Sequence, residues 1–297
     1  MSVAPAELIT VRDWLRYAVS QMERHATVFG QGTDNAWDEA VFLVLRSLRL
    51  PIDQLDPFLD ARLLPAERSQ LADILRQRCE DHIPTPYLVG EAWLQGHCFV
   101  VSRDVLIPRS PISELIQARL EPWIDPERVT QVADICTGSG CLAILAALEF
   151  PSAQVHATDI SEAAIKIAQT NIGNYGLSRQ VTLYQGDMLD ALPTDTTYDL
   201  IICNPPYVND QSMKRLPAEF RQEPSLALAG GEDGMDLVRR LLRGASDRLA
   251  PEGHLLLEIG HEREHFELAF PDLSPLWLDT QATESQIMLL PATDLRS

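Results

Sequence analysis

Residues 133–143 read ADICTGSGCLA, an apolar run that passes through a glycine turn into a helical pattern. Glycine at positions 138 and 140 lets the backbone turn tightly and lets a ligand approach the main chain without a Cβ clash. The spacing Gly138-x-Gly140-x-x-Ala143 also satisfies the loose dinucleotide fingerprint. Glycine turns after strands are common, so this stretch indicates a nucleotide site only together with its neighbours.

The chain beyond about Val129 alternates strand and helix patterns. We predict strands over 130–136, 153–158, 180–185, 198–203 and 253–259, with helices over 140–149, 161–175 and 234–249. This alternation implies an α/β fold with a mainly parallel sheet and helices on both faces. Two further apolar runs, Leu276–Leu278 and Gln286–Leu290, lie close together in the sequence, so we expect the last strand to be antiparallel.

The first 80 residues carry three amphipathic helical patterns and no convincing strand. The patterns cover Thr10–Glu23, Ala36–Leu48 and Pro65–Cys79, and Asp34 or Asn35 fits the N-cap of the second. From Tyr87 to Val101 the pattern alternates, with glycines at bends, which predicts a hairpin before a helix that begins near Pro111. We therefore predict a helical N-terminal domain at 1–80, a β-hairpin connector at 81–118 and a larger α/β domain at 119–297.

The composition is that of an ordinary soluble globular protein, with 45% hydrophobic and 23% charged residues. No apolar run approaches the ~20 residues that span a bilayer, and Met1–Pro5 lacks the basic start of a signal peptide. The five cysteines are odd in number and form no C-x-x-C pair, which argues against zinc and against a disulfide framework. We expect a cytoplasmic protein without a metal.

The formal net charge is −19. Proteins that hold nucleic-acid phosphates usually carry a basic face, so we expect no direct nucleic-acid binding. The acidic excess is spread along the chain and should attract a basic partner. The alternative is that the charge only reflects an acidic soluble protein.

Three further residues support a nucleotide site. Asp159 ends the second predicted strand, about 20 residues past the glycines, where a carboxylate can accept hydrogen bonds from both ribose hydroxyls. Alternatively Asp159 caps the next helix, although Ser161 can take that role. Asp187 could accept from an adenine amino group and Met188 could pack on the ring, but a simple turn also fits this pair. A nicotinamide cofactor and S-adenosylmethionine fit these features equally, because both place adenosine across the same strand ends.

The residues after the fourth predicted strand distinguish between the two cofactors. These residues are Asn204-Pro205-Pro206-Tyr207. Neither proline can donate to a sheet ladder, so the strand ends there. The Asn204 side-chain oxygen and the Pro205 carbonyl could accept both hydrogens of a planar NH2 group, and Tyr207 could stack on it. Such a grip would orient the nitrogen lone pair and stabilise positive charge that grows on nitrogen during methyl transfer. The alternative is an Asn-Pro turn without chemistry.

Nearly the whole chain resembles the protein-(glutamine-N5) methyltransferase family, which uses S-adenosylmethionine. The resemblance rests on Tyr87–Gly90, Leu106–Arg109, Cys136–Gly140, Asn204–Tyr207 and Glu223–Gly234, together with the helical N-terminal region. It implies a class I S-adenosylmethionine-dependent methyltransferase domain, Rossmann-like, with a mostly parallel seven-stranded sheet whose last strand is antiparallel. Many relatives carry glycine where this chain has Cys136, but Gly138 and Gly140 keep the turn feasible.

The family has two branches, which act on peptide-chain release factors and on the third protein of the large ribosomal subunit. The release-factor branch typically reads Pro-Arg-Pro-Glu-Thr-Glu in the connector, whereas this chain reads Pro108-Arg109-Ser110-Pro111-Ile112-Ser113-Glu114. That sequence resembles the ribosomal-protein branch, and a strongly basic ribosomal protein suits the net charge of −19.

The expected activity is therefore methylation of a glutamine side-chain amide in a ribosomal protein of the large subunit. The catalytic assignment is Asn204, Pro205, Pro206 and Tyr207, and the cofactor assignment is Cys136, Thr137, Gly138, Ser139, Gly140, Asp159, Asp187, Met188 and Asn204. The alternatives are the same chemistry on a release factor, methylation of an exocyclic amine of a nucleic-acid base, and a cofactor-binding module without chemistry. Glu258 and His261 end another strand near this rim, and we expect them to begin a helix or to form hydrogen bonds.

Overall fold

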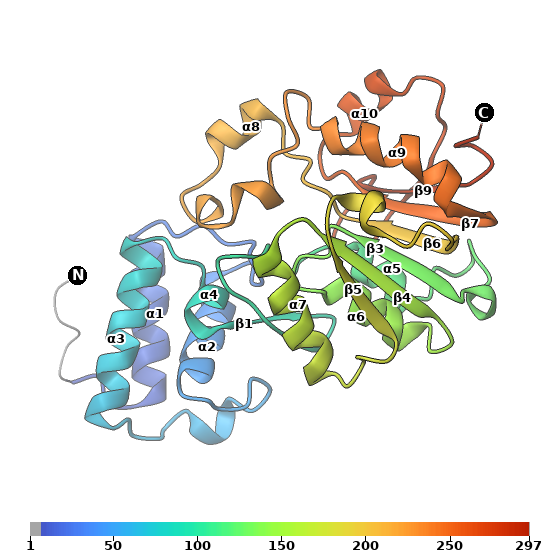
Figure 1. Cartoon of the computed structure of the whole chain (residues 1–297). Coiled ribbons are helices and arrows are strands. Elements are labelled where there is room, and N and C mark those ends of the chain that lie inside the picture. Colours follow the sequence, from blue (N-terminus) through green and yellow to red (C-terminus); the bar gives the residue numbers. More distant parts are fainter. Residues whose placement is uncertain (1–6, 297) are drawn as a thin grey trace. The chain divides into compact units, whose positions relative to one another are not determined.

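The computed structural model describes residues 7–296 (Figure 1). Contacts between backbone positions divide the chain into two compact units. The first unit runs to Ala92 and also contains Val101–Arg103 and Pro217–Gln222, and the second contains Trp93–Val100, Asp104–Leu216 and the chain from Glu223 onward. The domain limits at residues 80 and 118 stay predictions.

The first unit is built from helices, as the N-terminal patterns predict. The helices are α1 (Val11–Arg24), α2 (Ala36–Ser47), α3 (Pro65–Glu80) and α4 (Thr85–Val89), with a 3-10 turn at Asp56–Phe58. Thr10 begins α1, since its hydroxyl accepts from the Asp13 backbone N–H at 3.2 Å. Asn35, one of the two predicted caps, accepts from the Asp38 N–H at 2.9 Å and begins α2. Buried apolar side chains such as Trp14, Leu43 and Leu71 form the core of the unit.

A buried cluster of charged and polar groups joins the elements of this unit. Arg78 on α3 is 1% exposed and donates to the Glu39 carboxylate on α2 and to the Val28 carbonyl, the latter at 2.7 Å. Thr85 donates to the same carboxylate at 2.7 Å. Glu219 enters from the Pro217–Gln222 segment, accepts from the Val28 N–H at 3.0 Å, and lies 3.5 Å from the Arg78 guanidinium. This segment is therefore tied into the first unit by side-chain bonds.

The hairpin is shorter than the sequence predicts. Its strands are β1 (Glu91–Leu94) and β2 (His97–Val100), and residues 87–89 belong to α4 instead. The prediction of strand at 87–89 was wrong because Pro86 lies in the first turn of a helix, where its missing N–H is no loss. Gly90, with φ of +79°, then ends that helix in the left-handed conformation.

The second unit contains a seven-stranded sheet, which confirms the predicted fold class. Its strands are β3 (Gln131–Ile135), β4 (Gln154–Asp159), β5 (Val181–Gln185), β6 (Tyr198–Cys203), β7 (Leu249–Glu258), β8 (Leu276–Leu278) and β9 (Ile287–Pro291). The order is β5-β4-β3-β6-β7-β9-β8, and only β9 runs antiparallel to its neighbours. The predicted antiparallel last strand is confirmed.

Both faces of this sheet are buried under helices. The helices of this unit are α5 (Ile112–Gln117), α6 (Cys141–Glu149), α7 (Glu162–Asn174), α8 (Asp210–Arg215), α9 (Asp236–Arg248) and α10 (Arg263–Ala269). Short 3-10 turns of this unit occupy Pro126–Arg128, Met188–Ala191 and Ser225–Ala227, and a further one at Phe220–Gln222 belongs to the first unit. Leu200 packs in the core beneath α5 and α6, and its neighbour Ile201 packs in the core beneath α9 and α10. Burial on both faces explains why β6 reads as a continuous apolar run.

In the second unit, three elements depart from the sequence prediction. The short helices α8 and α10 have no predicted counterpart, because six or seven residues give too weak a periodic signal. β7 begins at Leu249 rather than at 253, since Leu249 pairs with Tyr198 before the register shifts. Gly253 lies at this irregularity, where a Cβ would come within 2.6 Å of the Tyr198 carbonyl oxygen.

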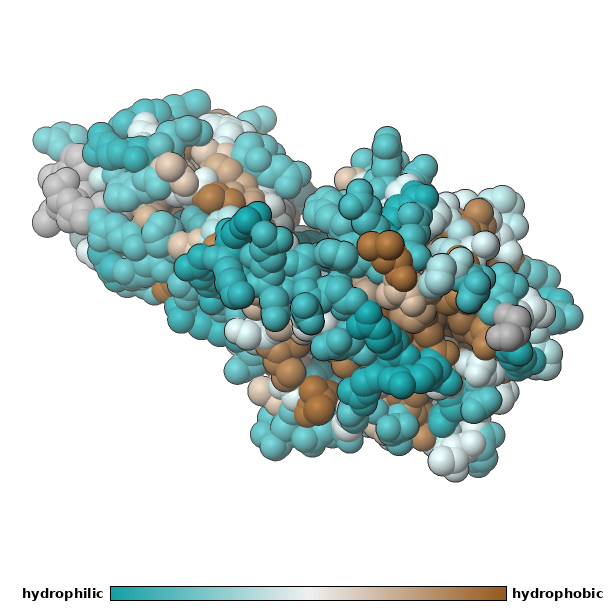
Figure 2. All heavy atoms as spheres, turned by 90° about the horizontal axis from the view of Figure 1, so that it is seen from above, coloured by the Kyte–Doolittle hydropathy of each residue, from teal (hydrophilic) through white to brown (hydrophobic). Residues whose placement is uncertain are grey.

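The visible face in Figure 2 is covered mainly by hydrophilic side chains, with smaller apolar patches between them. Among residues 7–296, no helix is both long and apolar enough to cross a membrane.

Replacing Arg78 by Met should destabilise the protein by about 3–5 kcal/mol, because it leaves the buried carboxylates of Glu39 and Glu219 without their cation. Urea unfolding followed by circular dichroism measures the change. Arg76→Met is the matched control on the same helix, since Arg76 pairs with Asp81 at the surface. Equal midpoints for the two variants would show that the buried cluster is not a source of stability.

Candidate active site

The predicted site residues all follow strands that lie side by side. β4 pairs with β5 and β3, and β3 pairs with β6, all in parallel. Because the carboxyl ends of neighbouring parallel strands meet at one edge, the four predicted segments gather there. They are the glycine loop (Cys136–Gly140), Asp159, Asp187 with Met188, and the Asn-Pro-Pro-Tyr loop (Asn204–Tyr207).

The glycine loop turns by left-handed backbone at three positions. The φ angles are +62° at Cys136, +56° at Gly138 and +81° at Gly140, the residue that begins α6. A Cβ on Gly140 would meet Ala168 of α7 at 3.1 Å, so glycine also allows close packing there. At Cys136 the left-handed conformation costs roughly 1–2 kcal/mol that a glycine would avoid. The departure from the family pattern at Cys136 therefore carries a backbone cost.

Asp159 ties the glycine loop to the end of β4. Its Oδ2 accepts from the Gly138 N–H at 2.9 Å and its Oδ1 accepts from the Ser161 N–H at 2.9 Å. Ser161 itself caps α7 by accepting from the Ala164 N–H at 3.2 Å, so the helix does not require Asp159 as its cap. Burial raises the pKa of Asp159. Each carboxylate oxygen can accept a further hydrogen bond, which a ribose hydroxyl could supply.

Asp134 is a site residue to which the sequence assigned no role. It is 1% exposed, and its Oδ2 accepts from the Thr137 hydroxyl at 2.5 Å and from the Ala143 N–H at 3.0 Å. These bonds fix the glycine loop to the strand before it and to the helix after it. Burial raises the pKa of Asp134 to about 7. The available signal was a carboxylate inside an otherwise apolar strand, which needs donors nearby.

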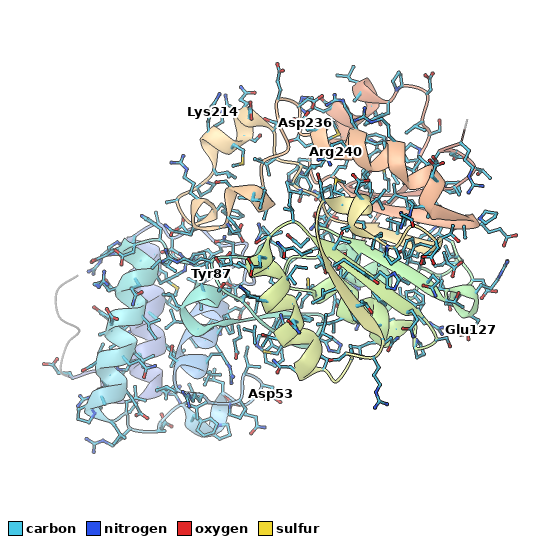
Figure 3. The ribbon with its side chains drawn as sticks, in the orientation of Figure 1. Asp53, Tyr87, Glu127, Lys214, Asp236 and Arg240 are labelled. Atoms are coloured by element: carbon cyan, nitrogen blue, oxygen red, sulfur yellow. The ribbon has the colours of Figure 1, made fainter. Side chains whose placement is uncertain are left out.

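Asp187 and Met188 lie directly after β5. The Arg240 guanidinium on α9, labelled in Figure 3, donates to Asp187 Oδ2 at 2.6 Å. The Met188 side chain is buried in the core beneath α9, beside Leu189 and Leu192. The predicted adenine contacts of this pair stay predictions. Ile160, which follows Asp159 and is 54% exposed, is an apolar surface at the same edge that sequence reasoning missed.

The Asn-Pro-Pro-Tyr loop is held by a second loop that contains three glycines. The Val208 N–H donates to the Leu228 carbonyl at 2.8 Å, and the Gly230 N–H donates to the Val208 carbonyl at 2.9 Å. A Cβ on Gly230 would lie 2.7 Å from Tyr207 Cα, and one on Gly234 would lie 2.2 Å from the Tyr207 carbonyl oxygen. Gly230 and Gly234 of the family-like stretch Glu223–Gly234 are therefore required by the close approach of the Tyr207 backbone, whereas a Cβ on Gly231 would meet the Asp236 carboxylate.

The Tyr207 side chain is anchored within the protein. Its hydroxyl donates to Glu258 Oε1 at 3.0 Å, and Ser110 donates to Oε2 of the same carboxylate. Burial, and then the nearby charge of Glu258, raise the pKa of Tyr207 well above its ordinary value. His261 lies in a different environment, with its Nδ1 3.1 Å from the Gln286 side-chain nitrogen at the surface. Stacking of Tyr207 on a target group stays a prediction.

Within the part of the chain that the structure describes, no group of three or more His, Cys, Asp or Glu side chains is placed to hold a metal ion. The edge of the sheet instead offers the Asp159 carboxylate, the backbone of the glycine loop, and the side-chain amide of Asn204 with the Pro205 carbonyl. These groups suit an adenosine ligand beside a planar amide.

Comparison with known proteins gives closely similar sequences. Residues 114–231 match the methyltransferase small domain family. The ribosomal protein uL3 glutamine methyltransferase of Bordetella pertussis is 57% identical over 98% of both chains. That of Burkholderia pseudomallei is 48% identical over 99% of this chain and 98% of its own. A methyltransferase structure from Pyrococcus furiosus covers 77% of this chain and 98% of its own, with 17% identity and a TM-score of 0.47.

Replacing Asp134 by Asn should stabilise the protein more at pH 8 than at pH 5. The folded-state pKa of about 7 exceeds the ordinary value, so the folded state binds this proton more tightly than the unfolded state. That contribution is complete below the ordinary pKa and is lost as the pH rises through about 7. Asn cannot ionise, and its side-chain oxygen can accept the bonds from Thr137 and Ala143.

Thermal midpoints of wild type and variant between pH 5 and 8 measure this difference. Asp233→Asn is the control, because the hydrogen bond from Arg239 lowers the pKa of Asp233 to about 2, outside this range. Its effect should not vary with pH. A pH-independent effect of Asp134→Asn as well would contradict the prediction.

Proposed function

Because this chain belongs to the family of ribosomal protein uL3 glutamine methyltransferases, we propose that it transfers a methyl group from S-adenosylmethionine to a glutamine side-chain amide of ribosomal protein uL3. The matches support this proposal over nearly the whole length of the chain. The main structural support is the position of the Asn-Pro-Pro-Tyr loop, which leaves β6 beside the glycine loop that follows β3. The net charge of −19 suits a basic ribosomal substrate.

The residues around the glycine loop fit the cofactor. S-adenosylmethionine, when bound, supplies a methyl group on a positively charged sulfur. Asp159 would hold the ribose hydroxyls with the lone pairs that Gly138 and Ser161 leave free. The glycine loop would present its backbone to the rest of the cofactor, and Asp187, Met188 and the exposed Ile160 would border the adenine.

The Asn-Pro-Pro-Tyr loop would hold the target amide. An amide nitrogen is a poor nucleophile, since its lone pair is delocalised into the carbonyl. The Asn204 side-chain oxygen and the Pro205 carbonyl would accept its two hydrogens, direct the lone pair at the methyl carbon, and stabilise the positive charge that grows on nitrogen. The methylated nitrogen is strongly acidic, so the proton leaves without a dedicated base.

The helical N-terminal domain at 1–80 would recognise the substrate, with the connector at 81–118 between it and the α/β domain. A reaction on a ribosomal protein would take place in the cytoplasm. Two of the three arginines near 240 are neutralised by carboxylates, since Arg239 pairs with Asp233 and Arg240 pairs with Asp187. This pairing disfavours the nucleic-acid alternative.

In an assay with labelled S-adenosylmethionine, we expect the label in ribosomal protein uL3 and specifically on a glutamine after peptide analysis. A peptide-chain release factor, ribosomal RNA and an unrelated basic protein are the competing substrates. Label only in the release factor would overturn the choice of substrate, and label only in RNA would overturn glutamine methylation.

Replacing Asn204 by Ala should lower kcat by at least about 10²-fold while the Kd for S-adenosylmethionine changes little, because it removes an acceptor aimed at the reacting nitrogen. Methyl transfer kinetics and calorimetric cofactor binding check the two quantities. Asn209→Ala is the matched control, since Asn209 caps α8 by accepting from the Ser212 N–H at 2.9 Å. Parallel loss of cofactor binding and turnover in Asn204→Ala would contradict a role confined to the target amide and would assign Asn204 to cofactor binding or to the fold.

A further inference from the structure

Glu258 is a buried carboxylate beside the reacting loop, and methyl transfer as described above does not use it. It ends β7 and is 4% exposed. β7 pairs with β6 in parallel with Leu257 opposite Cys203. Glu258 therefore lies one residue further along the edge, at the level where Asn204 begins the Asn-Pro-Pro-Tyr loop.

Two hydroxyl groups meet on this carboxylate. Tyr207 donates to Oε1 at 3.0 Å, and Ser110 donates to Oε2. The ring of Tyr207 is also confined from the side, because a Cβ on Gly260 would come within 2.5 Å of its Cε2 atom. Ring and hydroxyl are thus both fixed from the end of β7.

The connector that supplies Ser110 is itself tied down. Its neighbour Arg109 makes two bonds to the Glu223 carboxylate, at 2.5 and 2.7 Å, and the Ile107 N–H donates to the same carboxylate at 3.3 Å. Glu223 begins the stretch whose glycines pack on the Tyr207 backbone. The connector therefore contacts both sets of groups that hold Tyr207.

Burying a carboxylate beside a tyrosine costs free energy, because the charged group loses its hydration. Burial raises the pKa of Glu258, against the hydrogen bonds from Ser110 and Tyr207 that favour its charged form. An apolar pair of similar volume would often be as stable or more stable. Unlike an apolar side chain, the carboxylate orients its neighbours, because each of its oxygens accepts a hydrogen bond from one hydroxyl in a defined geometry.

We propose that Glu258, held by Ser110, is a positioning residue for methyl transfer that fixes Tyr207 and thereby the acceptors at Asn204 and Pro205. This inference rests on the proposed function. Ser110 lies in the connector sequence that differs between this chain and the release-factor branch. The Ser110 bond thus links the sequence that distinguishes this chain from that branch to the reacting loop.

The test compares Glu258→Leu, Glu258→Gln and Ser110→Ala. Glu258→Leu should lower kcat by about 10²-fold, the cost of a displacement near 1 Å, while the Kd for S-adenosylmethionine stays within about two-fold. Glu258→Gln should recover most of this loss, because its amide oxygen can accept from Tyr207 while its NH2 donates to Ser110. Ser110→Ala should lower kcat by about ten-fold.

Ser113→Ala is the matched control, since Ser113 is a buried serine of the same connector that donates to the Ser110 carbonyl and not to Glu258. It should retain kcat. A Glu258→Leu variant with the kcat of the wild type would overturn the proposal. So would a Gln variant as slow as Leu, because a positioning role predicts rescue.

A second readout is independent of turnover. With ¹³C-labelled tyrosine, the ring signal that disappears in Tyr207→Phe belongs to Tyr207. In wild type this ring should flip slowly, and in Glu258→Leu it should flip quickly. If the Tyr207 ring flips slowly in wild type but no methyl group is transferred to uL3, the proposed function is wrong, while the role of Glu258 in fixing Tyr207 is supported. An equally mobile ring in both proteins would refute the positioning role itself.

Discussion

The parallel pairing of β3 with β6 is the constraint on which the candidate site depends. Ile135 lies opposite Cys203, so the glycine loop and the Asn-Pro-Pro-Tyr loop leave the sheet at the same level. A slip of one residue would move Ile201 and Cys203 from the core beneath α9 to the opposite core. Because both faces of the sheet are buried, this register is strongly specified, and the geometry of the site follows from the packing of the core.

Beyond the sheet, buried and half-buried carboxylates fix the loops. Asp134 and Asp159 hold the glycine loop, Glu223 holds the connector, and Glu258 holds Tyr207. A loop cannot rely on a hydrogen-bond ladder, but a carboxylate can accept from several donors at once. The donors around each carboxylate offset part of the cost of burying its charge. The protein's own side chains therefore hold these loops, which is what a preorganised site requires.

Sequence reasoning found the parts of the site that are local in the chain. The glycine turn, Asp159 and the Asn-Pro-Pro-Tyr loop each sit at a strand end, and strand order follows from the alternation of patterns. It did not find the partners, because Ser110 and Glu258 are 148 positions apart and nothing in either neighbourhood points to the other. The glycines at 230 and 234 were recognised only through family resemblance. They are needed because a side chain there would clash with the Tyr207 backbone, which the sequence does not show. The helix at Thr85–Val89 was missed because alternation outweighed the two prolines that begin it.

The Pro217–Gln222 segment has a consequence for how the protein is made. It belongs to the first unit, yet it is encoded far inside the stretch that otherwise builds the second. During synthesis, the ion pair between Arg78 and Glu219 cannot form until most of the chain has left the ribosome. The helical unit cannot complete its native contacts as an early folding unit, and it cannot be exchanged between proteins by cutting at one point. The helical unit must therefore evolve together with the second unit of the same chain.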